Sequence, residues 1–214
     1  VYVADREGDL RALIDAAARR GTPADWLIRS KHDRKTTTGE KLWERLAQSE
    51  PLGEVEFTLS AAPARPARRV RQTLYRQAVT LPAHHGQPAV TVTALLAREE
   101  QPPAEQPALV WRLLTNRPAE TLDDVVQLID WYRKRWLIEV FFRIWKAGCR
   151  VEALQLGTFE RLERALVVYL IIAWRILHLV TWGRDCPQLP CEVVFDPEEW
   201  QAAWIVAYRA KPPE

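Results

Sequence analysis

The feature that most constrains the fold is a change in the spacing of apolar residues along the chain. Residues 1–4 and 26–28 are short apolar runs typical of buried strands, and apolar residues between them recur at helical spacing up to Gly21. Over residues 34–114 the pattern changes to strand-like runs separated by turns that contain proline or glycine. Those runs are residues 55–59, 70–81, 89–96 and 109–114. This order predicts an α/β sheet interrupted by a β-rich insertion.

Helical spacing returns after the strand-rich block. Thr121 followed by Asp124 approximates a capping box, in which each side chain bonds the other residue's backbone N–H at a helix start. From there the pattern predicts one helix to about Ala147, with Gly148 as its end. Two further helices are expected at residues 158–182 and 198–208.

The segment 165–182 is long and apolar enough to raise the question of a membrane span. Arg175 and His178 interrupt the apolar run, and no pattern of basic loops flanks it. We therefore expect a helix that is buried in the core of a soluble protein.

Length and composition fit one sizeable domain, or a domain with an insertion, because the chain has 214 residues of which 48% are hydrophobic. The net charge is only +2, so bulk charge does not by itself indicate a nucleic-acid binder. Positive charge is nevertheless concentrated in residues 65–76 and 133–150. For the arginines of the first stretch, two interpretations stay open: contact with DNA phosphates, or the solvent-exposed face of a strand.

Three cysteines, Cys149, Cys186 and Cys191, are odd in number and irregularly spaced, unlike a secreted disulfide framework. Reduced thiols in a cytoplasm are the simpler interpretation. Their spacing with His178 matches no common zinc site, so we expect no metal there. The chain contains no methionine, and we expect it to be part of a longer protein.

One face of the helix that follows Thr121 gathers polar side chains. On an ideal helix, an arc of about 80° contains five of them: Tyr132, Arg135, Glu139, Arg143 and Lys146. Apolar residues such as Ile129 and Trp136 fall on another arc, which suits packing on a sheet. Arg133 interrupts this apolar arc, and the sequence offers no reason for it.

Two interpretations of the polar face stay open. A carboxylate at Glu139 suits Mg²⁺ or Mn²⁺, and the flanking basic groups suit phosphates, a combination used in phosphoryl transfer. The alternative is a solvated face, since mixed charges at i, i+4 spacing are common, and spacing alone favours it. A metal site also needs further carboxylates. Asp5 follows a predicted strand, which is where α/β sheets present ligand-binding groups.

Four residues of the polar face have a defined spacing, Tyr132-x-x-Arg135-x-x-x-Glu139-x-x-x-x-x-x-Lys146. This pattern resembles the Tyr-Arg-Glu-Lys motif of DDE transposases of the insertion-sequence-four family. Residues 5–9 resemble that family's second catalytic aspartate block, and residues 29–32 resemble the segment after its next strand. The resemblance runs from residue 1 to about residue 182.

The resemblance implies an α/β fold with an RNase H-like (retroviral-integrase-like) core and a β-rich insertion before the helix that bears the glutamate. We expect residues 1–31 to form the first part of the core, 32–117 the insertion, 118–184 the core helices and 185–214 a C-terminal tail with a short helix. The family's first catalytic aspartate lies on an earlier strand, and no candidate precedes Asp5. We therefore expect the core to be truncated at its N-terminus.

The resemblance also implies roles for individual residues. Asp5 and Glu139 would be the catalytic metal ligands of a site for two Mg²⁺ (or Mn²⁺) ions. The residues implied to bind DNA are Arg29, Tyr132, Arg135, Arg143 and Lys146. Trp111 occupies the position of a tryptophan that stacks on a flipped base, and the alternative is a core tryptophan, one of ten in the chain. Asp9 is expected to cap the helix that follows it.

The function implied is DNA transposition: metal-dependent hydrolytic cleavage at transposon ends, followed by strand transfer to target DNA. The partners implied are double-stranded DNA and a second copy of the protein in a synaptic complex, in a bacterial cytoplasm at the nucleoid and without a membrane. Because the first aspartate is missing, we expect these 214 residues alone to be catalytically silent. Two alternatives stay open: an inactive DNA-binding or inhibitory fragment, and a related nuclease without strand transfer.

Overall fold

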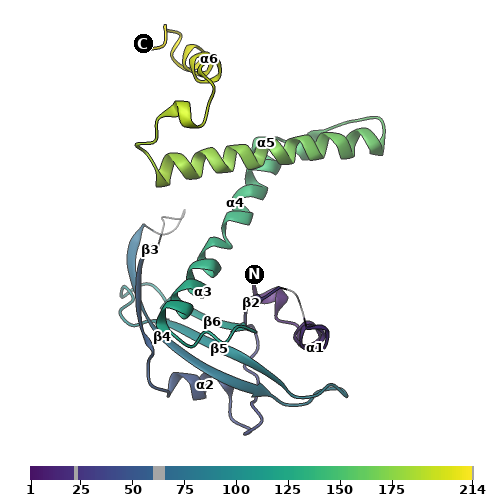
Figure 1. Ribbon diagram of the computed structural model, residues 1–214, viewed down its shortest axis with the longest axis vertical. Coiled ribbons are helices and arrows are strands. Elements are labelled where there is room, and N and C mark those ends of the chain that lie inside the picture. Colours follow the sequence, from purple (N-terminus) through teal and green to yellow (C-terminus); the bar gives the residue numbers. More distant parts are fainter. Residues whose placement is uncertain (22–23, 60–65, 214) are drawn as a thin grey trace. The chain divides into compact units, whose positions relative to one another are not determined.

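The computed structural model of the protein describes residues 1–21, 24–59 and 66–213. They form two compact units, Val1–Trp136 and Leu137–Glu214 (Figure 1).

The first unit is built on one curled sheet of six strands in the order β1-β2-β6-β5-β4-β3. Its strands are β1 (Tyr2–Ala4), β2 (Trp26–Arg29), β3 (Gly53–Leu59), β4 (Arg68–Leu81), β5 (Val90–Glu99) and β6 (Val110–Thr115). The predicted strands are therefore confirmed. β1 and β2 pair in parallel, and each of the other neighbouring pairs is antiparallel. The fold is thus mixed α/β, as the order of apolar patterns indicated.

The strand-rich block continues the sheet of the first two strands. β6 pairs with β2 on one side, with Ile28 opposite Leu114, and with β5 on the other. A boundary between core and insertion near residues 31 and 117 therefore does not separate two sheets, and it stays a prediction.

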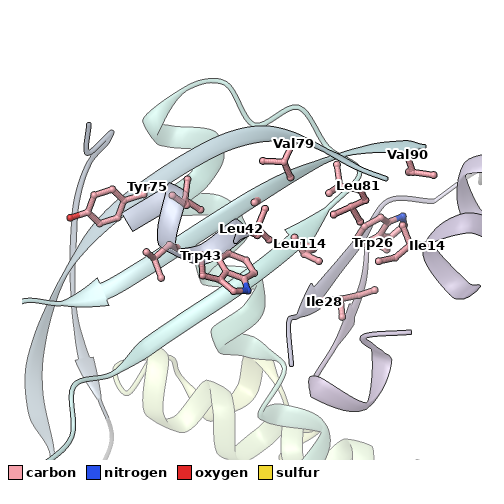
Figure 2. Close-up of a cluster of buried hydrophobic side chains, with 14 residues drawn as sticks. Ile14, Trp26, Ile28, Leu42, Trp43, Tyr75, Val79, Leu81, Val90 and Leu114 are labelled. Atoms are coloured by element: carbon pink, nitrogen blue, oxygen red, sulfur yellow. The ribbon is translucent and has the colours of Figure 1, made fainter. Parts of the chain in front are cut away.

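Two helices lie against one face of the sheet. Helix α1 (Arg11–Arg20) ends at Gly21, whose φ of 56° is the left-handed conformation that a glycine adopts most readily. Helix α2 (Leu42–Ala47) was not predicted, because a six-residue helix is too short for a clear period. Figure 2 shows the side chains that pack between these helices and the sheet, among them Ile14 of α1, Trp43 of α2, Trp26 of β2 and Leu114 of β6.

Helix α3 (Leu122–Lys134) covers the other face (Figure 1). The predicted capping box is confirmed: the Asp124 amide donates to the Thr121 hydroxyl at 3.2 Å, and the Thr121 amide donates to the Asp124 carboxylate at 3.0 Å. The start of α3 lies so close to β3 that a Cβ added at Gly53 would be 2.7 Å from the Leu122 side chain. A glycine at that position lets the helix pack onto the strand.

The prediction of one helix up to residue 147 is wrong. Helix α3 ends at Lys134, α4 (Leu137–Arg143) follows after a break, and η2 (Ile144–Gly148) is a turn of π-helix. At the break the Arg135 amide donates to the Tyr132 carbonyl at 3.2 Å, an i to i−3 bond that tightens the turn. Spacing alone could not reveal the break because neither glycine nor proline marks it. Gly148 does end the π-helical turn, as expected.

The second unit is helical. After η3 (Val151–Ala153) come α5 (Phe159–Asp185), η4 (Cys191–Val193) and α6 (Pro197–Tyr208). Both helices predicted for this region are confirmed. Thr158 caps α5 by accepting a hydrogen bond from the Arg161 amide at 3.3 Å.

The expected burial of α5 is wrong. Among the described residues, Ala173 is the one side chain of this helix that is buried. The helix has more apolar side chains than its packing partners cover, and by length and composition alone it could cross a membrane. A long apolar period predicts a helix but does not say what covers its faces.

Candidate functional site

Asp5 and Arg29 come together at the carboxyl ends of two parallel strands. The register of β1 and β2 ends with Ala4 opposite Ile28, so Asp5 and Arg29 are the next residues along. Successive side chains point to opposite faces of a strand. Leu27 packs under α3, and Arg29, two residues further along β2, therefore points to the same face of the sheet. Asp5 is opposite Arg29 when the register is continued by one residue, so it belongs to that face as well. A carboxylate and a guanidinium therefore share one corner of the sheet.

The chain turns sharply after Asp5. Its carboxylate accepts a hydrogen bond from the Glu7 amide at 2.9 Å and so caps the 3-10 turn η1 (Arg6–Gly8). A Cβ added at Gly8 would lie 2.6 Å from the Ala4 Cβ, so this turn can fold back on β1 only with glycine there. The Asp5 side chain is half-buried.

Asp9 ends the same turn and is buried, with 2% of its surface exposed. The prediction that it caps the following helix is wrong, because the N-cap residue of α1 is Leu10, which makes no side-chain cap hydrogen bond. The Asp9 carboxylate instead accepts hydrogen bonds from the amides of Lys31 at 2.6 Å and His32 at 3.0 Å. A carboxylate that bonds backbone amides from a distant loop is a structural tie that spacing within the chain does not reveal.

Tyr132 and Trp111 are packed in the core beneath α3. They are 6% and 7% exposed, and their ring centroids lie 5.4 Å apart at an angle of 67°. Trp111 also stacks on Phe57, with centroids 5.5 Å apart and rings 10° from parallel. The prediction that Tyr132 belongs to the polar face is therefore wrong, because its side chain points from α3 toward the sheet. Stacking of Trp111 on a flipped base stays a prediction, and in this conformation Phe57 occupies one face of the indole.

Arg133, whose place on the apolar arc the sequence does not explain, packs against one of the same aromatic residues. Its guanidinium lies 4.0 Å from the centre of the Phe57 ring and 2.8 Å from the Asp130 carboxylate. A cation over an aromatic face is favourable, and Arg133 interrupts the apolar arc for this reason.

The second unit carries the remaining predicted residues. Glu139 and Arg143 lie one turn apart on α4, so they share a face of that helix. Lys146 lies in η2 and pairs with Glu152 at 3.5 Å, with both side chains largely exposed. π-Helical turns occur frequently at functional sites, and this one directly follows α4, the helix that bears the predicted glutamate.

The predicted site residues are divided between the two units. Asp5, Arg29 and Trp111 belong to the sheet face under α3. Tyr132 packs onto that face from the helix, and Arg135 follows the end of the helix. Glu139, Arg143 and Lys146 belong to the second unit. Carboxylate oxygens suit Mg²⁺, so Asp5 and Glu139 fit a metal by their chemistry. Across residues 1–21, 24–59 and 66–213, no three His, Cys, Asp or Glu side chains gather. The joining of Asp5 with Glu139 stays a prediction.

Comparison with known families now decides the class of protein. Residues 1–175 match the family described as Transposase DDE domain. The chain belongs to this transposase family. The match contains every predicted site residue, from Asp5 to Lys146, and it confirms a DDE transposase as the class to which the sequence points.

A second family match covers residues that follow the predicted site residues. Residues 171–214 match the Transposase Tn5 dimerisation domain. They include the last part of α5 and all of α6. The sequence pattern predicts only a tail with a short helix for residues 185–214. The sequence signal that could have been used is the density of apolar residues in both helices. In the structure several of these side chains are exposed, with Ile171 at 62% and Val206 at 82%.

The arginines of β4 already have partners within the transposase. Arg68 forms a two-pronged pair with Glu99, and Arg69 and Arg71 lie 3.1 and 3.9 Å from Glu56 and Glu54 on β3. Arg76 donates to the Pro118 carbonyl at 2.6 Å. These contacts favour the strand-face interpretation over phosphate binding. Arg65 lies outside the described residues.

Proposed function

We propose that this chain contributes the catalytic core of a cut-and-paste DDE transposase of the insertion-sequence-four family. The proposal rests above all on the family match over residues 1–175, which includes both predicted carboxylates. The sheet supports it, because Asp5 and Arg29 end adjacent parallel strands. In this proposal the RNase H-like core comprises residues 1–31 and 118–184, with residues 32–117 as the insertion and 185–214 following the core.

Asp5 and Glu139 are the proposed metal ligands. Transposases of this class generally use divalent metals, and Mg²⁺ or Mn²⁺ bound there would activate water and stabilise charge on the phosphate. The carboxylate of Asp5 is held at the strand end by its bond to the Glu7 amide. Glu139 is half-buried on α4, where helical geometry fixes the direction of its side chain.

Basic residues on either side of the carboxylates are proposed to bind DNA phosphates. Arg29 ends β2, Arg135 follows α3, and Arg143 and Lys146 follow Glu139 along the helix. Guanidinium and ammonium groups neutralise phosphates and release counterions, so binding should weaken as salt rises. Trp111 is the proposed base-stacking residue. It must move out of the core to stack on a base, because its side chain is buried and Phe57 covers one face of its ring.

The assembled enzyme is proposed to be a homodimer on two transposon ends, working on the bacterial nucleoid in the cytoplasm. The dimerisation match over residues 171–214 and the exposed apolar side chains of α5 and α6 support this. Strand transfer would follow cleavage, as in other cut-and-paste elements.

The test is cleavage of a duplex that carries the element's terminal inverted repeats, with the full-length protein and Mg²⁺. Asp5→Asn and Glu139→Gln should each lower the cleavage rate at least about a hundredfold, because each removes a charged metal ligand. Asp25→Asn is the matched control for Asp5: it removes a carboxylate near the opposite end of the β1–β2 pair, where Asp25 bonds Arg117 at 3.0 Å. Cleavage by Glu139→Gln at the wild-type rate would contradict the proposal.

A further inference from the structure

Asp9 is a buried carboxylate whose hydrogen bonds come from the loop that follows β2. Its Oδ2 accepts from the amides of Lys31 and His32 and from the Ser30 hydroxyl, the last at 3.1 Å. Its Oδ1 lies 2.6 Å from Nη1 of Arg34, a charge contact without hydrogen-bond geometry, and its carbonyl accepts from Nη2 of the same arginine at 3.2 Å. Burying a charge requires such compensation. One residue thus satisfies several donors from a loop more than twenty positions away.

These bonds hold the loop that follows β2. Helix α2 fastens the same loop from its other side, where the Trp43 indole donates to the His32 carbonyl at 3.2 Å and the Trp43 amide donates to Asp33 at 3.2 Å. The backbone of Lys31 and His32 is therefore fixed, while both side chains are exposed. Because the loop backbone is already held in place, its basic side chains can bind a phosphate without the entropic cost of ordering a mobile loop.

Asp9 also connects this loop to the predicted metal ligand. Asp5 begins the 3-10 turn and Asp9 ends it, where the Asp9 amide donates to the Arg6 carbonyl at 3.4 Å. The turn that carries Asp5 and the loop that carries Lys31 are therefore joined through one buried side chain.

We propose that Asp9 is a positioning residue that holds the 29–32 loop so that Lys31 and Arg29 meet a DNA phosphate beside Asp5. This inference rests on the proposed function, because it assumes that the chain binds DNA. It predicts a change in DNA affinity on mutation of Asp9 that is opposite in sign to the change expected from charge alone. Removing a negative charge near DNA should strengthen binding, whereas losing the tie should weaken it.

The experiment measures binding of the full chain to a short random-sequence DNA duplex by fluorescence anisotropy over a series of salt concentrations. Asp9→Asn should weaken binding about tenfold and lower the slope of log Kd against log salt by about one, the loss of one phosphate contact. The matched control is Asp15→Asn, because this substitution also removes a buried carboxylate that is paired with an arginine. Asp15 is 4% exposed and lies 2.7 Å from Arg11. Affinity of this control should stay at or above that of the wild type.

A double-mutant cycle separates positioning from general damage. Lys31→Ala should weaken binding in the wild-type background and have little further effect in Asp9→Asn, because the loop is already displaced. Amide hydrogen exchange at residues 31 and 32 should also rise in Asp9→Asn and not in Asp15→Asn. If Asp9→Asn does not fold, Ser30→Ala provides the test, since it removes one donor to Asp9 and should give the same loss to a smaller degree.

The outcomes are distinct. Wild-type or tighter binding by Asp9→Asn overturns the inference and leaves the proposed function in place. A full effect of Lys31→Ala in the Asp9→Asn background also overturns it. A wild-type chain that does not bind the duplex overturns the proposed DNA contacts themselves, and this inference with them.

Discussion

At the scale of single residues, Trp111 is held between aromatic rings of different elements. Phe57 on β3 stacks on its indole and Tyr132 on α3 meets it edge-on. Both residues belong to the core cluster beneath α3, together with the fully buried Leu128 and Ile129. A residue in this position contributes to stability whether or not it also contacts a base.

Trp111→Ala should therefore lower the free energy of unfolding by about 3–5 kcal/mol, the usual cost of removing a buried aromatic side chain. Urea unfolding followed by circular dichroism measures the change. Trp136→Ala is the control: Trp136 is 60% exposed, so its removal should alter stability by no more than about 0.5 kcal/mol. Equal stability of the two variants would show that Trp111 does not support the core.

At the scale of elements, the long hairpin of β4 and β5 is closed by a buried ion pair. Arg68 and Glu99 form two parallel contacts, and Glu99 also accepts from the Leu109 amide at 2.8 Å. Hydrogen bonding from Arg68, partly opposed by burial, holds the pKa of the Glu99 carboxyl below its ordinary value. The pair therefore fastens the start of β6 to the hairpin.

A lowered carboxyl pKa gives a definite pH dependence. Stability from Glu99 is fully present above the ordinary pKa of an unfolded glutamate and is lost as pH falls through the lowered folded value. Glu99→Gln should cost about 3 kcal/mol at neutral pH, because it leaves Arg68 without its charge partner. The difference from wild type should shrink in acid. Urea unfolding of both proteins at neutral and at acidic pH measures this difference in the free energy of unfolding.

The control for that prediction is Glu54→Gln. Glu54 and Arg71 lie 3.9 Å apart with both side chains mostly exposed, so the change should stay within about 1 kcal/mol at either pH. A Glu99→Gln deficit that is constant with pH would contradict the assigned role of the ion pair.

At the scale of the whole molecule, the two units differ in how fully they cover their apolar side chains. The first unit has a buried cluster on each face of its sheet. In the second, α5 and α6 leave Ile171 and Val206 largely exposed, within the residues that match a dimerisation domain. A contiguous exposed apolar surface commonly marks an interface.

Val206→Glu should accordingly shift a dimer of the full chain toward the monomer, because it places a charge in an apolar interface. Sedimentation velocity over a range of protein concentrations measures the change, and an increase of about tenfold in the dimer dissociation constant is expected. Leu13→Glu is the matched control: Leu13 is an exposed apolar residue of α1, 47% exposed and outside the dimerisation match. If both variants dimerise like the wild type, Val206 is not at the interface.

The strands, most helices, the capping box at Thr121 and the transposase family can all be predicted from the amino-acid sequence. Apolar periodicity, caps and motif spacing are local properties, so they can be read within a few residues. The sequence does not reveal the break after α3, the burial of Tyr132, the exposure of α5 or the hydrogen-bond partners of Asp9. These four features emerge from the folded chain, because each depends on packing with residues distant in the sequence. Asp9 and His32, 23 positions apart, meet only once β1 and β2 have paired.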